Sequence, residues 1–437
     1  MKKSNLIKNK LFECINELCE NKKNYCVNPN SNFTRKSLLD FSTVMKTVLS
    51  FTDKSLNNEI VDIFLPKGFI VTASALIQQR SKIKTSAFYD LFTMFSQRTQ
   101  PTSLFKGFRL IAVDGSDIQI PVNPEDKDSY FEGTNGQAPY NLLHLNALYD
   151  ICSHTYVDAL VQKRRNCDER NALISMLKSG RFVSNTIIVA DRGFESYNVM
   201  ANLQELGLFY VIRVKDIHAN GIASALNLPD KEFDIPIDLN ITRKQSKETK
   251  ELFKDKRHYK FLPINAKFDF LPTKNKRSLP ATFYNLKFRI VRFKISDNTY
   301  ETIVTNLDLP VKDIKQMYSM RWGIETSFRT LKYSVGLLYF HSKKAELILQ
   351  EIFANLTIYN FTQLIASISI RKNGKKYKYQ VNISVAVNIC RNLFLDRISP
   401  QKCEAAIRKY ILPIRTDRKF IRHLHSKPAF SFTYRVA

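Results

Sequence analysis

The sequence predicts an α/β fold built on a mixed β-sheet flanked by helices. From residue 108 onward, short apolar runs of strand character alternate with segments of helical spacing. Their order is strand, hairpin, helix, strand, helix and strand, which is typical of a mixed α/β sheet. Residues 1–100, in contrast, lack strand alternation and predict a helical N-terminal region.

This N-terminal region contains a candidate DNA-reading element. Residues 71–84 predict one helix, and the segment AFYDLFTMF that follows Thr85-Ser86 predicts another. Arg80 and Lys82 are expected on the exposed face of the first helix. Two helices joined by a short polar turn can place side chains in a DNA groove, but an ordinary amphipathic pair with a solvated face fits the pattern equally well.

Residues 101–216 predict the first part of a sheet core. The apolar run 110–113 ends in Asp114, and the apolar run that begins at residue 186 ends in Asp191. Between these two runs, the pattern predicts a strand pair over 145–162, with a turn near Ser153, and then a helix over 168–180. The second run belongs to a predicted strand over 186–194, and a last strand is predicted over 208–216.

The remaining chain divides into three predicted parts. Residues 217–300 are rich in lysine and proline and end in strand-like segments, which predicts a β-rich insertion. Residues 301–370 return to the core and include a helix from about residue 311 to 335, which starts after Pro310. Residues 371–437 hold 16 Lys and Arg against three acidic residues and form a basic C-terminal region.

The charge of the chain favours a polyanionic partner. Lys and Arg outnumber Asp and Glu by 67 to 40, which gives a formal net charge of +27. Such a surplus attracts nucleic acid, although a ribosome-associated protein or a merely basic enzyme would share it. The composition is otherwise that of a soluble globular protein, with 44% hydrophobic residues.

Cysteine usage and hydropathy predict a cytoplasmic protein without a membrane segment, and a DNA partner would make it nucleoid-associated. The seven cysteines are scattered and odd in number, which indicates a reducing compartment. The N-terminus lacks the continuous apolar stretch of an export signal. The most apolar long segment, 345–370, carries several Glu, Gln and Asn residues and predicts a buried helix. The seven histidines show no metal-ligand spacing.

Two strand-terminal acids are the first candidates for chemistry. Asp114 and Asp191 each follow a buried strand, and functional sites in open α/β sheets collect at the carboxyl ends of strands. A turn or capping role is the common alternative for an Asp before Gly. Asp117 could be mistaken for the ligand, but strand alternation places it on the face opposite Asp114.

The predicted helix 311–335 supplies a polar stripe. At 100° per residue, four of its side chains fall within about 60° of the helix circumference, next to an apolar stripe; they are Tyr318, Arg321, Glu325 and Lys332. A solvated face with an Arg321–Glu325 pair would give the same pattern.

The spacing Tyr318-x2-Arg321-x3-Glu325-x6-Lys332 resembles the signature of the Tyr-Arg-Glu-Lys branch of insertion-sequence DDE transposases, the family numbered four. The segments AVDGSD (112–117) and IIVADRGFES (187–196) resemble the segments of that family that carry its first and second Asp. The resemblance covers residues 105 to 370 well, whereas the N-terminal hundred residues match only in general character.

The resemblance implies an RNase H-like catalytic core with a β-rich insertion between the second Asp and the Glu. The 134 residues that separate Asp191 from Glu325 leave room for such an insertion. By position, Asp114, Asp191 and Glu325 match the catalytic triad of the family. Carboxylates are hard ligands suited to Mg²⁺ or Mn²⁺, and two such ions would serve in-line displacement at phosphorus.

The same resemblance implies that the partner is double-stranded DNA, at terminal inverted repeats and at the target, and that two copies join in the synaptic complex. Tyr318, Arg321 and Lys332 would hold phosphates near the scissile bond, and a hairpin intermediate is compatible with them. Trp322, the single tryptophan, is a candidate for stacking on a base, although we expect it near the packed stripe, which favours a core position.

Two other functions remain open from the sequence. A catalytically inactive DNA-binding protein on a transposase scaffold would carry the same basic charge, but it predicts that an acid of the triad is missing, and all three are present. An RNase H-like nuclease without strand transfer would use the same acids, but it gives no reason for the stripe formed by Tyr318, Arg321 and Lys332.

Overall fold

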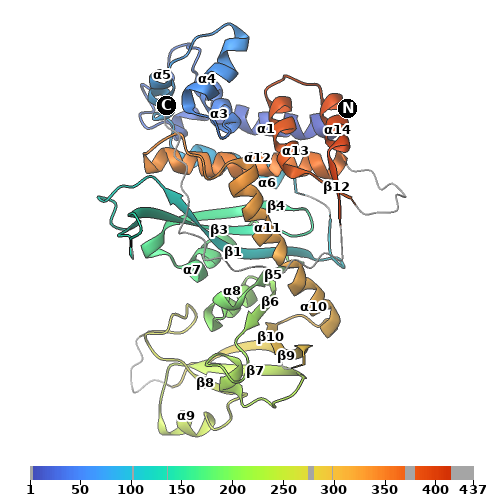
Figure 1. The fold of residues 1–437 in the computed structure, drawn as a ribbon. Helices are drawn as coiled ribbons and strands as arrows, with labels where there is room; N and C mark the ends of the chain where they lie inside the picture. The colour runs from blue at the N-terminus through green and yellow to red at the C-terminus, as the bar shows by residue number, and fades with distance from the viewer. Residues whose placement is uncertain are drawn as a thin grey trace.

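The computed structural model describes residues 3–100, 103–134, 136–273, 280–297, 299–369 and 379–414. Its centre is one large mixed sheet in which the strands run in the order β2-β3-β1-β5-β6-β10-β9-β7-β8, with β4 also paired to β3 (Figure 1). Helices cover both faces of this sheet, and a separate hydrophobic cluster lies on each face. The predicted α/β class, with a mixed sheet flanked by helices, is confirmed.

The strands begin and end close to the predicted segments. The first half of the sheet is formed by β1 (Arg109–Ile120), β2 (Tyr130–Phe131), β3 (Tyr140–Asp150), β4 (Thr155–Lys163), β5 (Thr186–Ala190) and β6 (Phe209–Val214). The second half is formed by β7 (Phe233–Thr242), β8 (Tyr259–Phe261), β9 (Tyr284–Ser296) and β10 (Thr299–Thr305), and a separate pair by β11 (Tyr379–Val381) and β12 (Ile411–Pro413).

The helices of the N-terminal region are α1 (Lys3–Glu20), α2 (Lys22–Tyr25), α3 (Phe41–Ser50), α4 (Leu56–Phe64), α5 (Ala73–Arg80) and α6 (Thr85–Arg98). Those that follow are α7 (Glu169–Leu177), α8 (Tyr197–Glu205), α9 (Lys247–Leu252), α10 (Val311–Met320), α11 (Trp322–Thr330), α12 (Ala345–Ser369), α13 (Ile383–Phe394) and α14 (Pro400–Lys409). The parts of the predicted basic C-terminal region at 371–378 and 415–437 lie outside the described residues.

The strand order around β1 is that of an RNase H-like core. β1 pairs antiparallel with β3, and β3 pairs antiparallel with β4, which makes a meander of three strands. On its other side, β1 pairs in parallel with β5, and β5 pairs in parallel with β6. The helix α8 connects β5 to β6 and packs against β6. This arrangement places the carboxyl end of β5 beside the middle of β1.

The strands of the segment 217–300 extend the same sheet. β10 pairs antiparallel with β6, and β9 continues the sheet from β10 to β7 and β8. The strand character expected of the segments around β9 and β10 is therefore confirmed. Without β10, the edge of β6 would expose unpaired backbone N–H and C=O groups, and the pairing with β10 satisfies these groups.

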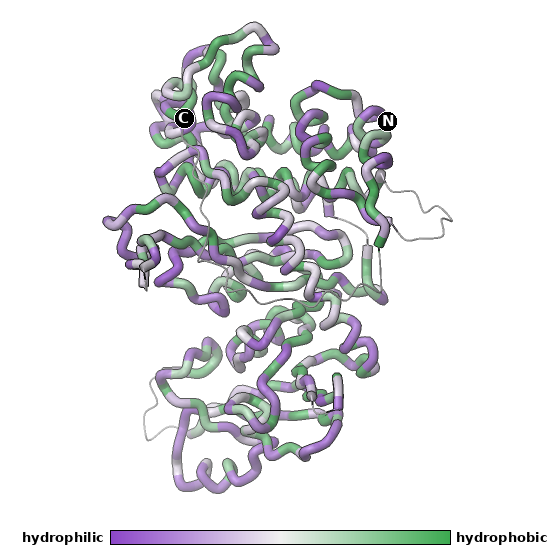
Figure 2. Tube along the Cα trace, in the orientation of Figure 1, coloured by the Kyte–Doolittle hydropathy of each residue, from purple (hydrophilic) through white to green (hydrophobic). Residues whose placement is uncertain are grey.

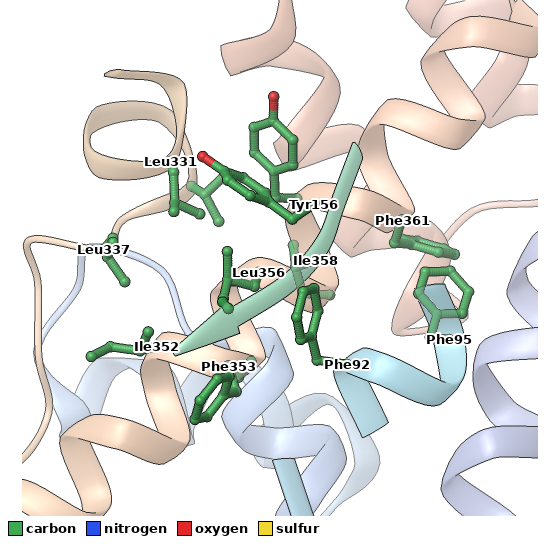
Figure 3. Close-up of a cluster of buried hydrophobic side chains, with 14 of the residues drawn as sticks. Phe92, Phe95, Tyr156, Leu331, Leu337, Ile352, Phe353, Leu356, Ile358 and Phe361 are labelled. Carbon is green, nitrogen blue, oxygen red and sulfur yellow. The ribbon is translucent and has the colours of Figure 1, made fainter. Parts of the chain in front are cut away.

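A layer of helices from both ends of the chain covers one face of the core sheet (Figure 1). The long helix α12 packs against α6, α1 and α3 of the N-terminal region and against α13. Figure 3 shows part of this interface, where Phe95 of α6 lies against Phe361 of α12 and Phe92 of α6 lies near Phe353 of α12. In Figure 2, hydrophobic segments gather along the core strands and α12. The N-terminal helices thus share one hydrophobic core with the sheet.

The predicted exposure of Arg80 is wrong. Its side chain is only 1% exposed, and its guanidinium donates hydrogen bonds to Gln350 and Glu351 of α12, each at 2.8 Å, and to the carbonyl of Leu347. Burial of a guanidinium requires partners of this kind, because an unpaired charge loses its hydration. Arg80 therefore joins α5 to α12 and does not face DNA, whereas Lys82 lies half-buried above the Phe33 ring.

The predicted helix 311–335 is divided at Arg321. The backbone of Arg321 is helical, but tighter hydrogen bonds from Arg321 to Tyr318 and from Ile324 to Arg321 separate α10 from α11. A π-helical turn over Leu331–Val335 follows α11 and ends at Gly336, whose φ of 106° suits glycine. Across the described residues, no helix has the length and apolar character needed to cross a membrane, and α12 is mostly buried, as predicted.

Candidate active site

The first two acids lie at matched positions on neighbouring parallel strands. The register pairs Ala112 of β1 with Val189 of β5. Asp114 is two residues after Ala112, and Asp191 is two residues after Val189, so the two acids occupy equivalent positions. The side chains of residues two apart in a strand point to the same face. β1 continues to Ile120, so Asp114 does not end its strand as predicted; it lies where the parallel pairing ends.

Both acids point to the sheet face that carries α11. Ala112 and Val189 belong to the hydrophobic cluster of this face, together with Ile324 of α11. Their neighbours Val113 and Ala190 belong to the cluster on the opposite face. Because α11 lies against β1, residues at its sheet-facing rim are brought to the two strand acids.

Glu325 and Arg321 reach the first acid from α11. Arg321 donates a hydrogen bond to Glu325 at 2.7 Å, and another nitrogen of its guanidinium lies 3.7 Å from the carboxylate of Asp114. The Nε atom of Arg321 is buried and has no hydrogen-bond partner within the described part of the chain. The two acids that the sequence separates by about half of its length therefore share one arginine.

Burial raises the pKa of Asp114 to about 6, and the neighbouring Asp191 and Glu325 add to the rise. A hydrogen bond from the backbone N–H of Gly115 at 2.8 Å and the charge of Arg321 act in the opposite direction. Asp191 in turn accepts a hydrogen bond from Gly193 at 2.8 Å, which fixes the turn after β5. The charges of Asp191, at the end of β5, and of Glu325, on α11, both act on Asp114.

This acid cluster fits a hard divalent cation. Its groups are three carboxylates, and burial raises the pKa of one of them, Asp114, to about 6. A cation would relieve the repulsion that raises the pKa of Asp114 and would compete with Arg321 for Asp114 and Glu325. Asp114, Asp191 and Glu325 are the residues that would hold it.

Tyr318 is buried, contrary to the prediction that it contacts DNA from an exposed stripe. Its side chain is 7% exposed, and the guanidinium of Arg321 lies 5.8 Å from its ring. Arg213 of β6 forms an ion pair of 3.2 Å with Glu301, and its charge acts against the rise that burial causes in the pKa of Tyr318. The sequence analysis missed Arg213; an arginine within the otherwise apolar strand segment LFYVIRV was the available signal.

Lys332 approaches the site from the turn after α11. Its ammonium donates a hydrogen bond of 2.7 Å to the backbone carbonyl of Asp117 in β1. Burial lowers the pKa of Lys332, while the nearby Asp117 carboxylate opposes this change. The side chain of Asp117 itself lies on the other face of β1, opposite His144 of β3, as strand alternation predicts.

Trp322 is exposed, so the expectation of a core position is wrong. Its side chain is 56% exposed at the start of α11, next to Arg321. Successive helix residues are about 100° apart, which carries Trp322 past Glu325 and away from the apolar stripe that contains Ile324 and Phe328. An exposed indole beside the acid cluster can stack on a nucleic-acid base.

A protein family and a solved structure are similar to this chain. Residues 106–361, more than half of the chain, match the family model described as the transposase DDE domain. A solved structure, the cryo-EM structure of a piggyBac transposase synaptic complex with hairpin DNA, is similar over 96% of this chain and 87% of that chain, with 10% sequence identity and a TM-score of 0.45. No curated protein matches the chain in sequence.

Proposed function

Because the chain belongs to the transposase DDE domain family, we propose that it is an active DNA transposase of the Tyr-Arg-Glu-Lys branch. It cuts DNA at the terminal inverted repeats of an insertion sequence and joins the freed 3′-OH ends to target DNA, and a hairpin intermediate is compatible with this route. The observation that carries the proposal is the approach of Glu325 and Arg321 from α11 to Asp114, while Asp191 occupies the matched position on the neighbouring parallel strand.

The three acids would hold divalent ions, Mg²⁺ with Mn²⁺ as a substitute, and two ions suit this chemistry. Bound there, such ions supply charge stabilisation to both the attacking and the leaving oxygen during displacement at phosphorus. The protein itself fixes the acids on rigid strands and on a helix packed against them, which limits their reorganisation. Arg321, with an unpaired buried Nε, can turn from Glu325 to a phosphate when a cation takes its place.

An exposed aromatic residue and two largely buried basic residues around the acids would bind the DNA. Trp322 lies beside the cluster and would stack on a base at the element end, while Arg321 and Lys332 would hold the flanking phosphates. Tyr318 would support Arg321 from below through its ring. Two copies of the chain would then hold the two element ends in one synaptic complex, with target DNA between them.

The proposal is tested with DNA that carries the inverted repeats flanking the gene. The full-length protein and Mg²⁺ are expected to produce both nicked element ends and joined products in a plasmid target. Nicked ends without joined products would indicate a nuclease, and binding without nicking would indicate an inactive transposase scaffold. Either result would overturn the proposal.

Substitution of Trp322 by Ala is expected to weaken binding to element-end DNA by about 5- to 150-fold, the effect of one lost base stack of about 1–3 kcal/mol. The Tm should stay nearly constant, because the indole is exposed. Tyr333→Ala removes another exposed aromatic residue of the same segment and serves as the control. Equal losses of affinity in both variants would contradict a specific stacking role for Trp322.

The pKa of Asp114 predicts how Mg²⁺ binding depends on pH. Because the pKa of Asp114 is raised to about 6, its carboxyl group is mostly protonated below pH 6. The group must then lose this proton before it can bind the cation. The Mg²⁺ concentration for half-maximal cleavage is therefore expected to rise by up to about tenfold per pH unit below pH 6 and to change little above pH 7. Titrations of the cleavage rate at several pH values test this; a constant Mg²⁺ requirement between pH 5 and 7 would contradict it.

A further inference from the structure

A second cluster of metal-binding side chains lies on the face of β1 opposite Asp114. Its centre is His144 of β3, whose side chain is 5% exposed. The ring atom Nδ1 lies 2.6 Å from a carboxylate oxygen of Asp117, the residue directly opposite in the strand pair. Arg164 also contacts this carboxylate, with its Nε atom 2.9 Å from the same oxygen. Asp117 thus fixes the orientation of the imidazole, and the Nε2 atom faces away from it.

Two further ligand atoms converge on that side of the ring. His144, Cys167 and Glu169 each offer one ligand atom, and these atoms all lie within 4.8 Å of one another. The Nε2 atom is 2.9 Å from an oxygen of Glu169, but the oxygen lies outside the direction of a hydrogen bond, and Nε2 has no such partner in the described residues. A buried ring nitrogen without a hydrogen bond is costly unless another group satisfies it.

The backbone is shaped around this ring nitrogen. A Cβ atom on Gly115 would lie 2.2 Å from Nε2 of His144 and 3.0 Å from an oxygen of Glu169. Glycine at position 115 therefore makes room for the imidazole and the carboxylate behind the strand. A Cβ on Gly193 would in turn lie 3.8 Å from the other oxygen of Glu169. The cluster thus lies next to Gly115 and Gly193, which follow Asp114 and Asp191 in the chain.

Cys167 and Glu169 come from the junction between β4 and α7. Cys167 ends a short 3-10 turn at Arg164–Asn166, and Glu169 is the first residue of α7. Asp168 between them caps the helix by accepting a hydrogen bond of 2.9 Å from Asn171, which fixes the backbone of both neighbours. The two ligands are thus held by the start of a regular helix, and His144 is held in the centre of a three-stranded pairing.

We propose that His144, Cys167 and Glu169 form a structural site for a thiophilic divalent cation such as Zn²⁺, separate from the acid cluster. Imidazole, thiolate and carboxylate are ligands that zinc accepts, with water as a fourth ligand, whereas Mg²⁺ prefers oxygen alone. The contact between Asp117 and His144 is the carboxylate–histidine–metal arrangement. One thiolate and one carboxylate balance the cation, and Asp117 is balanced by Arg164.

Such a cation would pin the start of α7 to β1 and β3 behind the turns of Asp114 and Asp191. Removing it is expected to lower the Tm of the protein without adding or removing any group of the acid cluster. Because the site does not include the acids, its existence does not depend on the proposed transposase activity.

Binding of Co²⁺ to the metal-free full-length protein tests the site. A thiolate-to-cobalt charge-transfer band and visible bands of tetrahedral cobalt are expected at one Co²⁺ per chain, and Zn²⁺ should displace them. Ions at the acid cluster give no thiolate band, because the triad contains only carboxylates. Cys167→Ser is expected to abolish the band, while Cys152→Ser, another half-buried free cysteine, should keep it.

Asp117→Asn keeps the three proposed ligands but removes the carboxylate that contacts Nδ1 of His144. It is expected to lower the affinity for Zn²⁺ by about 10- to 100-fold. The Tm gained on adding Zn²⁺ should be lost in Cys167→Ser and Glu169→Gln and kept in Cys152→Ser. The absence of a thiolate band in the folded wild-type protein, or an unchanged band in Cys167→Ser, would overturn the proposal. His144 would then be a histidine paired with two carboxylates.

Discussion

Substitution of Asp114 by Asn is expected to reduce cleavage of element-end DNA by about 1,000-fold or more. A carboxylate that binds catalytic cations contributes several kcal/mol to the transition state, and each 1.4 kcal/mol corresponds to about a tenfold change in rate. Asparagine retains the size of the side chain and can still accept the hydrogen bond from Gly115. DNA binding should therefore persist, which a gel-shift assay with the same substrate measures.

The same substitution is expected to stabilise the free protein. The pKa of Asp114 is about 6 in the folded chain, above its value of 3.8 in the unfolded chain, so folding favours the protonated form. The carboxylate therefore destabilises the fold above about pH 6, and this penalty disappears as the pH falls below the unfolded value. At pH 7, Asp114→Asn is expected to raise the free energy of unfolding by about 1–2 kcal/mol, after allowance for partial exposure.

Asp117→Asn is the matched control for both effects. Asp117 lies on the same strand, and although its burial raises the pKa, His144 and Arg164 lower it overall, so its carboxylate stabilises the fold. This variant is expected to lose stability at pH 7 and to retain most of its cleavage activity. If Asp117→Asn lost cleavage and Asp114→Asn retained it, the assignment of the first acid would be reversed.

Arg80→Met is expected to lower the free energy of unfolding by about 3–5 kcal/mol, the usual cost of removing one partner from a buried ion pair. The change leaves Glu351 buried, with His341 as a remaining side-chain partner, and leaves Gln350 without the hydrogen bond from Arg80. Methionine fills a similar volume, so a cavity contributes little. Chemical denaturation of the full-length protein without DNA measures this loss.

Lys82→Met serves as the control for Arg80, because Lys82 was an equal candidate for DNA contact and is only half-buried. It is expected to change the free energy of unfolding by less than about 0.5 kcal/mol. A reduction in DNA affinity without loss of stability in Lys82→Met would support a DNA contact at this position. A loss of DNA affinity without loss of stability in Arg80→Met would contradict the structural role of Arg80.

The parts of the fold that local patterns determine were predictable from the sequence. Apolar runs bounded by polar turns indicated β3, β4, β5 and β6, and the spacing of polar residues indicated the helix that carries Glu325. The pairing of β10 with β6 was not predictable, because no local pattern says which sheet edge a strand will join. The same holds for Arg80, whose partners on α12 lie some 270 residues away in the chain.

The candidate site was predictable where spacing within one element carried it. Strand ends and a helical stripe made Asp114, Asp191 and Glu325 candidates, and the resemblance to the transposase family assigned them together; the structure brings Glu325 and Asp114 to the same arginine. The exposure of Trp322 follows from its angular position on the helix, and Tyr318 is buried because it joins the hydrophobic core shared by the sheet and the helices. The cluster of His144 with Cys167 and Glu169 has no motif spacing, because the tertiary fold brings the start of α7 to β3.

Anomalous scattering from Mn²⁺ in crystals of the full-length protein bound to element-end DNA would test the central claim most directly. The acid cluster is predicted to hold Mn²⁺ between Asp114, Asp191 and Glu325 and next to a DNA phosphate, with Arg321 turned away from Glu325. Manganese bound elsewhere, or a Glu325 that stays paired with Arg321 while DNA is bound, would contradict a metal-dependent active site at these three acids.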